Sequence, residues 1–247
     1  MRSDFKAWTR TVLACLPWVA LLAVACGPSE LPSTKPEAAS GTDTANGLTA
    51  HDLLPLAEGN RWTYVIEKEQ QSADLQPVIS VETRIWHVAE VKEAGGGKQA
   101  VIQELNEDEK PIGELVLRVT DDGVYLVSQV LNGRRYTLNP PLPICVWPNE
   151  PGNTLTWSGT GLSDNPNLEL ETTITAKGMM EVDTASGRVE AYRTDISTRP
   201  KGGGGNPASD SSYWFAPGKG IVRNVDKLLV QNTFRKTTLK LKGETIR

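Results

Sequence analysis

The sequence predicts a mainly β protein, an antiparallel meander whose sheet is strongly curved into a half-barrel or folded into a two-layer sandwich. Apolar and polar residues alternate with a period of two over much of the chain after residue 52. Turn-forming glycine dipeptides separate these alternating runs. No stretch after residue 52 shows the apolar stripe of an amphipathic helix. We expect about ten to thirteen strands, a number that rarely stays flat.

A signal peptide is expected before the sheet. The first ten residues are basic overall, and the run 11–25 carries no charge. Such a run suits the core of a signal peptide and is short for a hydrocarbon layer of about 30 Å. It ends in LAVACG, from Leu22 to Gly27. Small residues before a cysteine resemble the lipobox of bacterial lipoproteins, although Ala23 stands where leucine is usual. We therefore expect residues 1–25 to be removed and Cys26 to carry lipid.

A disordered linker is expected next, over 26–51. Residues 27–50 contain three prolines, no aromatic residue, and neither valine nor isoleucine. Such a segment buries too little apolar surface to offset the entropy lost on ordering. The remainder, 52–247, is expected to form a single β-rich domain.

The strands follow in order along this domain. We expect them in 78–92, 98–105, 113–120, 124–131, 134–138, 168–176, 179–184 and 188–198, with a half-apolar strand near 239–241. Asn132-Gly133 is a preferred two-residue hairpin turn. Residues 139–151 hold five prolines and predict a long loop, because proline cannot donate to a central ladder. Residues 200–211, with four consecutive glycines, predict a mobile surface loop.

Three phrases carry a family resemblance. They are PLAEGNRWTY from Pro55, GRVEAYR from Gly187 and YWFAPGKGIV from Tyr213. In this order, over roughly 52–227, they resemble a broad group of uncharacterised bacterial exported lipoproteins. More distantly, the curved layout is similar to lipoprotein carriers and receptors of the LolA/LolB type. No catalytic residue is transferred from either resemblance.

Aromatic residues of these phrases and of a related one near Gly152 are candidates for the core or for an aromatic ligand groove. They are Trp62, Tyr64, Trp157, Tyr213, Trp214 and Phe215. Alternation places Tyr213 and Phe215 on one side of a strand and Trp214 on the other.

No reactive constellation stands out. Cys145 has no partner for a disulfide once Cys15 and Cys26 are assigned to the export segment, and we expect a buried apolar thiol. Neither His51 nor His87 has a second metal ligand at zinc spacing. The cluster Glu104, Glu107, Asp108 and Glu109 predicts a solvated hairpin tip. The run 164–169 lacks the spacing of a calcium loop.

The leading hypothesis is therefore a lipoprotein with a non-catalytic binding or scaffolding domain in the cell envelope. It is attached to a membrane through its lipid, at the outer membrane in a Gram-negative cell and otherwise on the outer face of the cell membrane. We expect no cofactor, and a hydrophobic ligand or envelope protein as partner. Nucleic acid is not expected, because the 222 residues after the signal carry a net charge of −6, against −4 for the whole chain.

Two alternatives stay open. One is a carrier or receptor for lipid or acylated polypeptide with a concave apolar face, which requires an internal cavity. The other is an envelope glycan hydrolase that works through two carboxylates about 5–10 Å apart.

Overall fold

Twelve strands in one antiparallel sheet make up most of the computed structural model, which describes residues 47–72, 76–131, 133–161, 168–201, 208–230 and 233–247. A single helical turn, α1 (Ala50–Leu53), precedes them. The strands are β1 (Arg61–Ser72), β2 (Val78–Ala94), β3 (Gly97–Leu105), β4 (Pro111–Thr120), β5 (Gly123–Leu131), β6 (Arg134–Val146), β7 (Thr154–Gly159), β8 (Leu170–Asp183), β9 (Arg188–Pro200), β10 (Ala208–Ala216), β11 (Gly220–Val230) and β12 (Thr233–Thr245).

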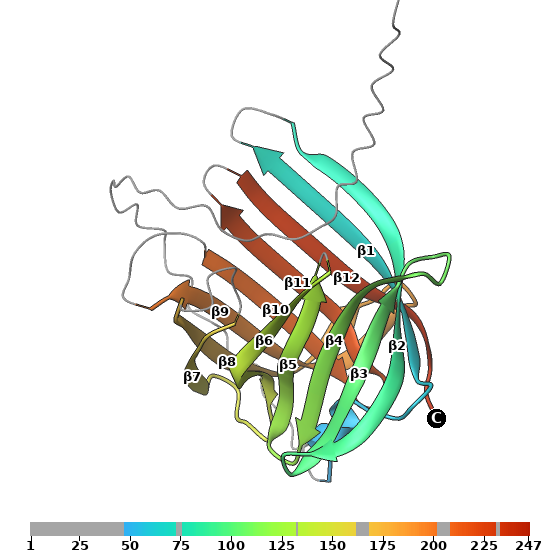
Figure 1. Cartoon of the computed structure of the whole chain (residues 1–247), viewed down its shortest axis with the longest axis vertical. Coiled ribbons are helices and arrows are strands. Elements are labelled where there is room, and N and C mark those ends of the chain that lie inside the picture. Colours follow the sequence, from blue (N-terminus) through green and yellow to red (C-terminus); the bar gives the residue numbers. More distant parts are fainter. Residues whose placement is uncertain (1–46, 73–75, 132, 162–167, 202–207, 231–232) are drawn as a thin grey trace, which may run out of the picture.

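The sheet nearly closes on itself. Neighbours in sequence pair from β1 to β6 and from β7 to β12, and β1 also pairs with β12. The two edges, β6 and β7, meet where the backbones of Asn139 and Thr160 exchange hydrogen bonds of 3.0 and 3.1 Å. As a result β3–β6 pass in front of β9–β12 (Figure 1). The predicted strongly curved antiparallel meander is confirmed.

The concave inner face holds the apolar core. Its buried side chains include Trp62, Tyr64, Ile66, Trp86, Ile102, Leu117, Tyr192, Phe215, Leu239 and Leu241. The helical turn α1 adds Ala50 and Leu53, both fully buried, to the same core. Thr49 caps this turn in a capping box with Asp52. Ordered packing thus begins at α1, inside the segment 26–51 for which the sequence predicts disorder.

The proline-rich segment corrects the predicted loop 139–151. Strand β6 continues through Pro140, Pro141 and Pro143 to Val146, and only the residues after it form a connection to β7. Prolines are compatible with this strand because β6 lies at an edge of the sheet, where part of its backbone has no ladder partner.

Strand β2 also departs from the simplest expectation. The apolar alternation of Ile79 and Val81 lies on the outer face, where these side chains are 61% and 66% exposed. Their neighbours Arg84 and Trp86 point inward instead, because they pair with the inner-face residues Tyr64 and Trp62 of β1. Period two alone identifies a strand but does not say which of its faces is buried.

Several predicted turns are confirmed. Pro217 and Gly218 lie in a turn closed by a hydrogen bond from the Lys219 amide to the Ala216 carbonyl. Gly220 adopts φ +82, and a Cβ there would approach Trp62 Nε1 to 3.0 Å. The glycine is therefore needed both for its backbone conformation and for close packing. Of the predicted mobile loop 200–211, residues 202–207 lie outside the described residues, whereas Pro200 ends β9 and residues 208–211 belong to β10, which corrects the prediction at those positions.

Candidate functional site

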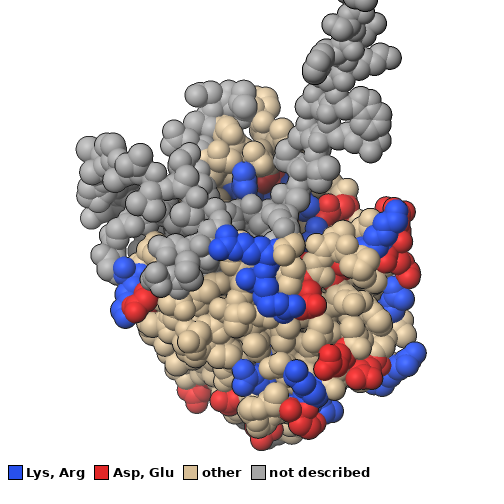
Figure 2. Space-filling model, in the orientation of Figure 1, with Lys and Arg blue, Asp and Glu red and all other residues tan. Residues whose placement is uncertain are grey.

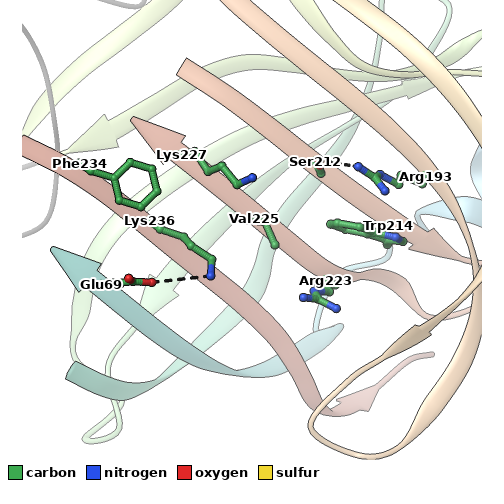
Figure 3. A pocket seen from close by; sticks show the side chains of 9 residues that line it. All are labelled: Glu69, Arg193, Ser212, Trp214, Arg223, Val225, Lys227, Phe234 and Lys236. Atoms are coloured by element: carbon green, nitrogen blue, oxygen red, sulfur yellow. Dashed lines mark hydrogen bonds and ion pairs between the residues drawn. The ribbon is translucent and has the colours of Figure 1, made fainter. Parts of the chain in front are cut away.

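A groove on the outer face is the candidate site. It has a volume of about 460 Å³ and crosses β10, β11 and β12 between residues of β9 and β1 (Figure 3). Its lining side chains are Glu69, Arg193, Ser212, Trp214, Arg223, Val225, Lys227, Phe234 and Lys236. They face outward because the alternate residues of the same strands, such as Ile66, Phe215 and Leu239, occupy the core.

Trp214 lies between two arginines at one end of this groove (Figure 3). The guanidinium carbons of Arg193 and Arg223 lie 4.9 and 5.2 Å from its ring centroid, because the register places the three residues side by side on β9, β10 and β11. Cation–π attraction stabilises such contacts and orients the guanidinium groups. The indole is consequently only 8% exposed. Trp214 thus serves as a support for two arginines rather than as an open stacking surface.

The two arginines differ in how their charge is compensated. Arg193 donates from Nε and Nη2 to the two carboxylate oxygens of Asp195, at 2.7 and 3.0 Å. Ser212 donates to the same carboxylate at 2.7 Å. Arg223 makes no ion pair with a described residue, and its Nε is enclosed without a hydrogen-bond partner among them. Among the cations that line the groove, Arg193 and Lys236 are paired with carboxylates, whereas Arg223 and Lys227 form no ion pair with a described residue.

An inner polar cluster lies on the opposite face of the sheet, on β1, β2 and β3. Lys68 Nζ lies 2.7 Å from Glu82, and Arg84 pairs with Glu82 and, at 3.6 Å, with Glu104. Trp86 Nε1 donates to Glu104 at 3.0 Å. Burial alone would raise the pKa of Glu82, but the hydrogen bond from Lys68 and the charge of Arg84 hold it below its usual value. These opposite charges compensate one another inside the sheet.

Glu104 belongs to this inner cluster and not to a hairpin tip, which corrects the sequence prediction for one of the four acidic residues. Glu104 is 8% exposed, whereas Glu107, Asp108 and Glu109 are exposed between β3 and β4 as predicted. The difference arises because Glu104 is still a strand residue, paired with inward-facing Trp86.

Asp226 is a second inward-facing acid, on β11. Burial raises the pKa of its carboxyl above the ordinary value, against hydrogen bonds from Ser211 and Asn224 that lower it. Tyr213 lies across from Asn224 on the neighbouring strand, and burial raises the pKa of its phenol as well. The register places no basic residue directly beside Asp226, whose partners are Ser211 and Thr237.

The structure separates the aromatic candidates. Trp62, Tyr64 and Phe215 are at most 1% exposed in the core, and Trp157 is 6% exposed. Polar atoms of these residues are satisfied, since Tyr64 donates its hydroxyl to the Ile221 carbonyl at 2.9 Å and Trp157 donates Nε1 to the Pro141 carbonyl at 3.1 Å. Tyr213 and Phe215 stack on the inner side, with ring centroids 6.2 Å apart. Among the six, Trp214 is the one that lines the outer groove.

The described cysteine is enclosed. Cys145 is fully buried, as predicted, and burial raises the pKa of its thiol to about 12. A thiol that is protonated at neutral pH and inaccessible is a poor nucleophile. Cys26, the expected lipid attachment residue, lies outside the described residues.

The same part of the chain holds neither a metal-binding cluster nor a membrane-spanning helix. No three His, Cys, Asp or Glu side chains among the residues placed by the structure gather at metal-binding geometry. The run 164–169, considered above as a calcium loop, lies largely beyond them. No described helix is long and apolar enough to cross a membrane.

Solved structures match this chain at low similarity. A provisionally assigned lipoprotein from Parabacteroides distasonis is 12% identical with a TM-score of 0.42, over 78% of this chain and 98% of that one. A provisionally assigned exported protein with a YmcC-like fold from Bacteroides fragilis is 16% identical with a TM-score of 0.41, over 77% and 98%. The hypothetical lipoprotein YmcC from Escherichia coli is 12% identical with a TM-score of 0.37, over 72% and 87%.

No protein-family model matches the sequence, and no curated protein matches it either. At the TM-scores of the solved structures, the similarity assigns neither a function nor a site residue to this chain.

Sequence reasoning identified Trp214 but not the groove around it. The signal was present in part, because RVEAYRTD and YWFAPG place Arg193 and Trp214 on outward faces once the strands are known. Which strands lie side by side is set by the pairing of β9, β10 and β11, and residue spacing in one sequence does not give that order.

Proposed function

We propose that this chain is an exported lipoprotein, lipidated at Cys26, whose sheet domain is a non-catalytic binding module. The anchor is supported by the uncharged run 11–25 together with the phrase LAVACG, which overlaps its end and contains Cys26. Cleavage before the cysteine would free an amine for a further acyl chain, and two or more chains give durable attachment where one is marginal. Residues 27–46 would then connect the lipid to the folded part, which begins near Thr49.

The outer groove supports a binding role. It combines a fixed arginine, two lysines and the apolar side chains of Val225 and Phe234 in one open surface feature. Small numbers of placed polar groups within a partly apolar depression are typical of ligand sites. A net charge of −4 for the whole chain makes this local gathering of cations distinctive. The front surface of the molecule differs, since its charged groups lie mainly along the margins of a broad uncharged area (Figure 2).

The packing supports this role over that of a lipid carrier. The apolar part of the inner face is occupied by large side chains that contact one another, among them Trp62, Tyr64 and Phe215. Helical turn α1 packs into the same cluster with Leu53 and Leu54. Apolar interior surface covered in this way is not available to an acyl chain.

The inner carboxylates favour binding over glycan hydrolysis. Glu82 and Glu104 both contact Arg84, and Glu82 also contacts Lys68. A general acid must hold a proton near neutral pH, whereas Lys68 and Arg84 favour the ionised form of Glu82. Structural charge pairing therefore explains this cluster without a catalytic role.

Mass spectrometry of the native protein extracted from membranes tests the anchor. We expect a mature chain that begins at Cys26 and carries the mass of two or three acyl chains. The variant Cys26→Ser should leave the membrane fraction or remain with its signal uncleaved and unacylated. A soluble wild-type chain with an unmodified amino terminus, or a Cys26→Ser chain that is cleaved and retained in the membrane like the wild type, would overturn the proposal.

A further inference from the structure

Two pairs of like charges face each other on the outer surface of the sheet. The register of β11 and β12 sets Arg223 opposite Lys240 and Lys227 opposite Lys236. Directly opposed residues of antiparallel strands share a face and have Cβ atoms about 4.5–5.5 Å apart, and like charges there destabilise the pairing. Val225 and Thr238 separate the two pairs. A sheet that keeps both pairs on adjacent strands carries a cost that a bound anion would remove.

The lysine pair is partly compensated by acids in its own row. Asp210 lies across from Lys227, and Glu69 lies across from Lys236 at an Nζ–carboxylate distance of 3.7 Å. Asp210 is already bound by Arg199 at 3.0 Å and by Ser197 at 2.7 Å. Each lysine of this row thus faces an acid, and the row is not the free binding group of the surface.

The pair Arg223 and Lys240 lacks this compensation. The residues next to it in register are Trp214 on β10 and Val65 on β1, and neither carries charge. No carboxylate of the described residues forms an ion pair with either cation. The nearest acidic residue on β9, Asp195, is engaged by Arg193 and Ser212.

Arg223 is also held in place. Its guanidinium lies on the Trp214 ring, and its enclosed Nε finds no acceptor within the described structure. A buried donor without an acceptor is costly. A guanidinium fixed before binding loses less conformational entropy when it engages a ligand. Its planar fork matches the two oxygens of a phosphate, and Lys240 adds a point charge from the opposite strand.

We propose that Arg223 and Lys240 form a binding site for the phosphate group of a phosphate ester. Arg223 lines the groove, and Lys240 lies opposite it on β12, outside the lining. The groove next to Arg223, with Val225 and Phe234, holds the organic part of the ligand, since about 460 Å³ greatly exceeds one phosphate. This assignment names the ligand chemistry of the binding module proposed above and rests on that binding role. Free phosphate esters and lipid headgroups share this chemistry.

Calorimetric titration of the native protein in neutral detergent tests the site. The first ligand is inorganic phosphate, and the second is dihexanoylphosphatidylglycerol with dihexanoylphosphatidylcholine as its zwitterionic comparator. We expect Arg223→Gln to weaken phosphate binding about tenfold or more, as loss of charge-assisted hydrogen bonds implies. Arg223→Lys should recover only part of the affinity, because it restores the charge but not the fork.

Arg188→Gln is the matched control. It removes the same charge from an exposed arginine that pairs with Glu181 and Asp183, away from the groove. The control should bind phosphate as the wild type does. Should Arg223→Gln fold poorly by circular dichroism, Lys240→Gln replaces it, with an expected loss of several-fold.

Comparison of the titrations with inorganic phosphate and with the anionic lipid identifies the source of the phosphate group. Tighter binding of the anionic lipid than of inorganic phosphate, dependent on Arg223, assigns a lipid headgroup, and equal binding assigns a soluble ester. No binding of either ligand to the wild type, or equal losses in Arg223→Gln and Arg188→Gln, would overturn the proposal. Mass spectrometry tests the lipidation of Cys26 independently of the titrations. A result against the lipid anchor can therefore be distinguished from a result against the phosphate site.

Discussion

At the scale of single residues, Asp226 shows how the inner face tolerates an acid without a basic neighbour. Burial raises the pKa of its carboxyl, so the folded state holds the proton more tightly than the unfolded state. Its contribution to stability is complete below the ordinary pKa of 3.8 and is lost as the pH rises through the folded value. At neutral pH, where the carboxyl of the unfolded chain is ionised, the cost of burying this group therefore opposes folding.

The variant Asp226→Asn should accordingly be more stable than the wild type at neutral pH. A gain of about 1 kcal/mol would raise the melting temperature by roughly 2–4 °C in a domain of this size. Below pH 3.8 the advantage should disappear, because Asp226 is then neutral in both states. Thermal melts from pH 3 to pH 8 measure this. A difference that stays constant across this range would contradict the assignment to ionisation.

Cys145 gives a second prediction at this scale. It is fully buried, and its pKa of about 12 leaves it protonated at neutral pH. Iodoacetamide should modify it only after unfolding, at a rate that follows the appearance of unfolded protein in urea. Peptide-resolved mass spectrometry separates this residue from Cys26. Rapid alkylation in native buffer would show that the thiol is accessible.

At the scale of secondary-structure elements, strand positions were predictable because alternation and turn chemistry are local. The hairpins around Gly95, Gly123 and Gly187 follow directly from them. Whether a strand lies at the edge of the sheet depends on pairing with distant residues and cannot be predicted from local sequence. For that reason the prolines of β6 predicted a loop, although an edge strand accommodates them. The same limit applies to the groove. Trp214 was a candidate from the sequence, but Arg223 and Lys240 become neighbours only through the register of β11 and β12.

The seam between β6 and β7 gives the prediction for elements. Gly161 has φ +101, and a Cβ there would lie 1.9 Å from the Thr137 carbonyl oxygen. Gly161→Ala should therefore separate the seam and expose the amides of Asn139 and Thr160, which exchange hydrogen bonds there. Faster hydrogen exchange at these two amides, with a lower melting temperature, is the expected result.

Gly187→Ala is the control for that variant. Gly187 also has a positive φ, +129, but a Cβ added there would meet no atom within 4 Å. Both substitutions carry the backbone strain of an L-residue at positive φ, about 1 kcal/mol or more. Only the variant at the seam adds the steric clash. Equal destabilisation by the two variants would show that the seam is not tightly constrained.

At the scale of the whole molecule, one long-range pairing connects two series of local hairpins. Strands β1 and β12 pair over twelve residue positions, from Arg61 with Thr245 to Ser72 with Thr233. Asn60 reinforces this connection, since it accepts a hydrogen bond from the Arg247 amide at 2.9 Å. The other ladders join strands that follow each other in sequence. Folding must therefore bring the first and last strands together across nearly the whole domain, which slows it.

A circular permutant that opens the chain between Asn149 and Glu150, and joins Arg247 to Gly47 by a flexible linker, tests this argument. The C-terminus, which follows the last strand, and α1 lie at the same end of the molecule (Figure 1). The permutation converts β12 and β1 into sequence neighbours and leaves only the short seam as a long-range contact. We expect refolding after dilution from urea to accelerate several-fold, because contact order falls. The melting temperature should change little, since every ladder is retained. Refolding no faster than that of the natural chain order would show that closure of β1 against β12 is not the step that limits folding.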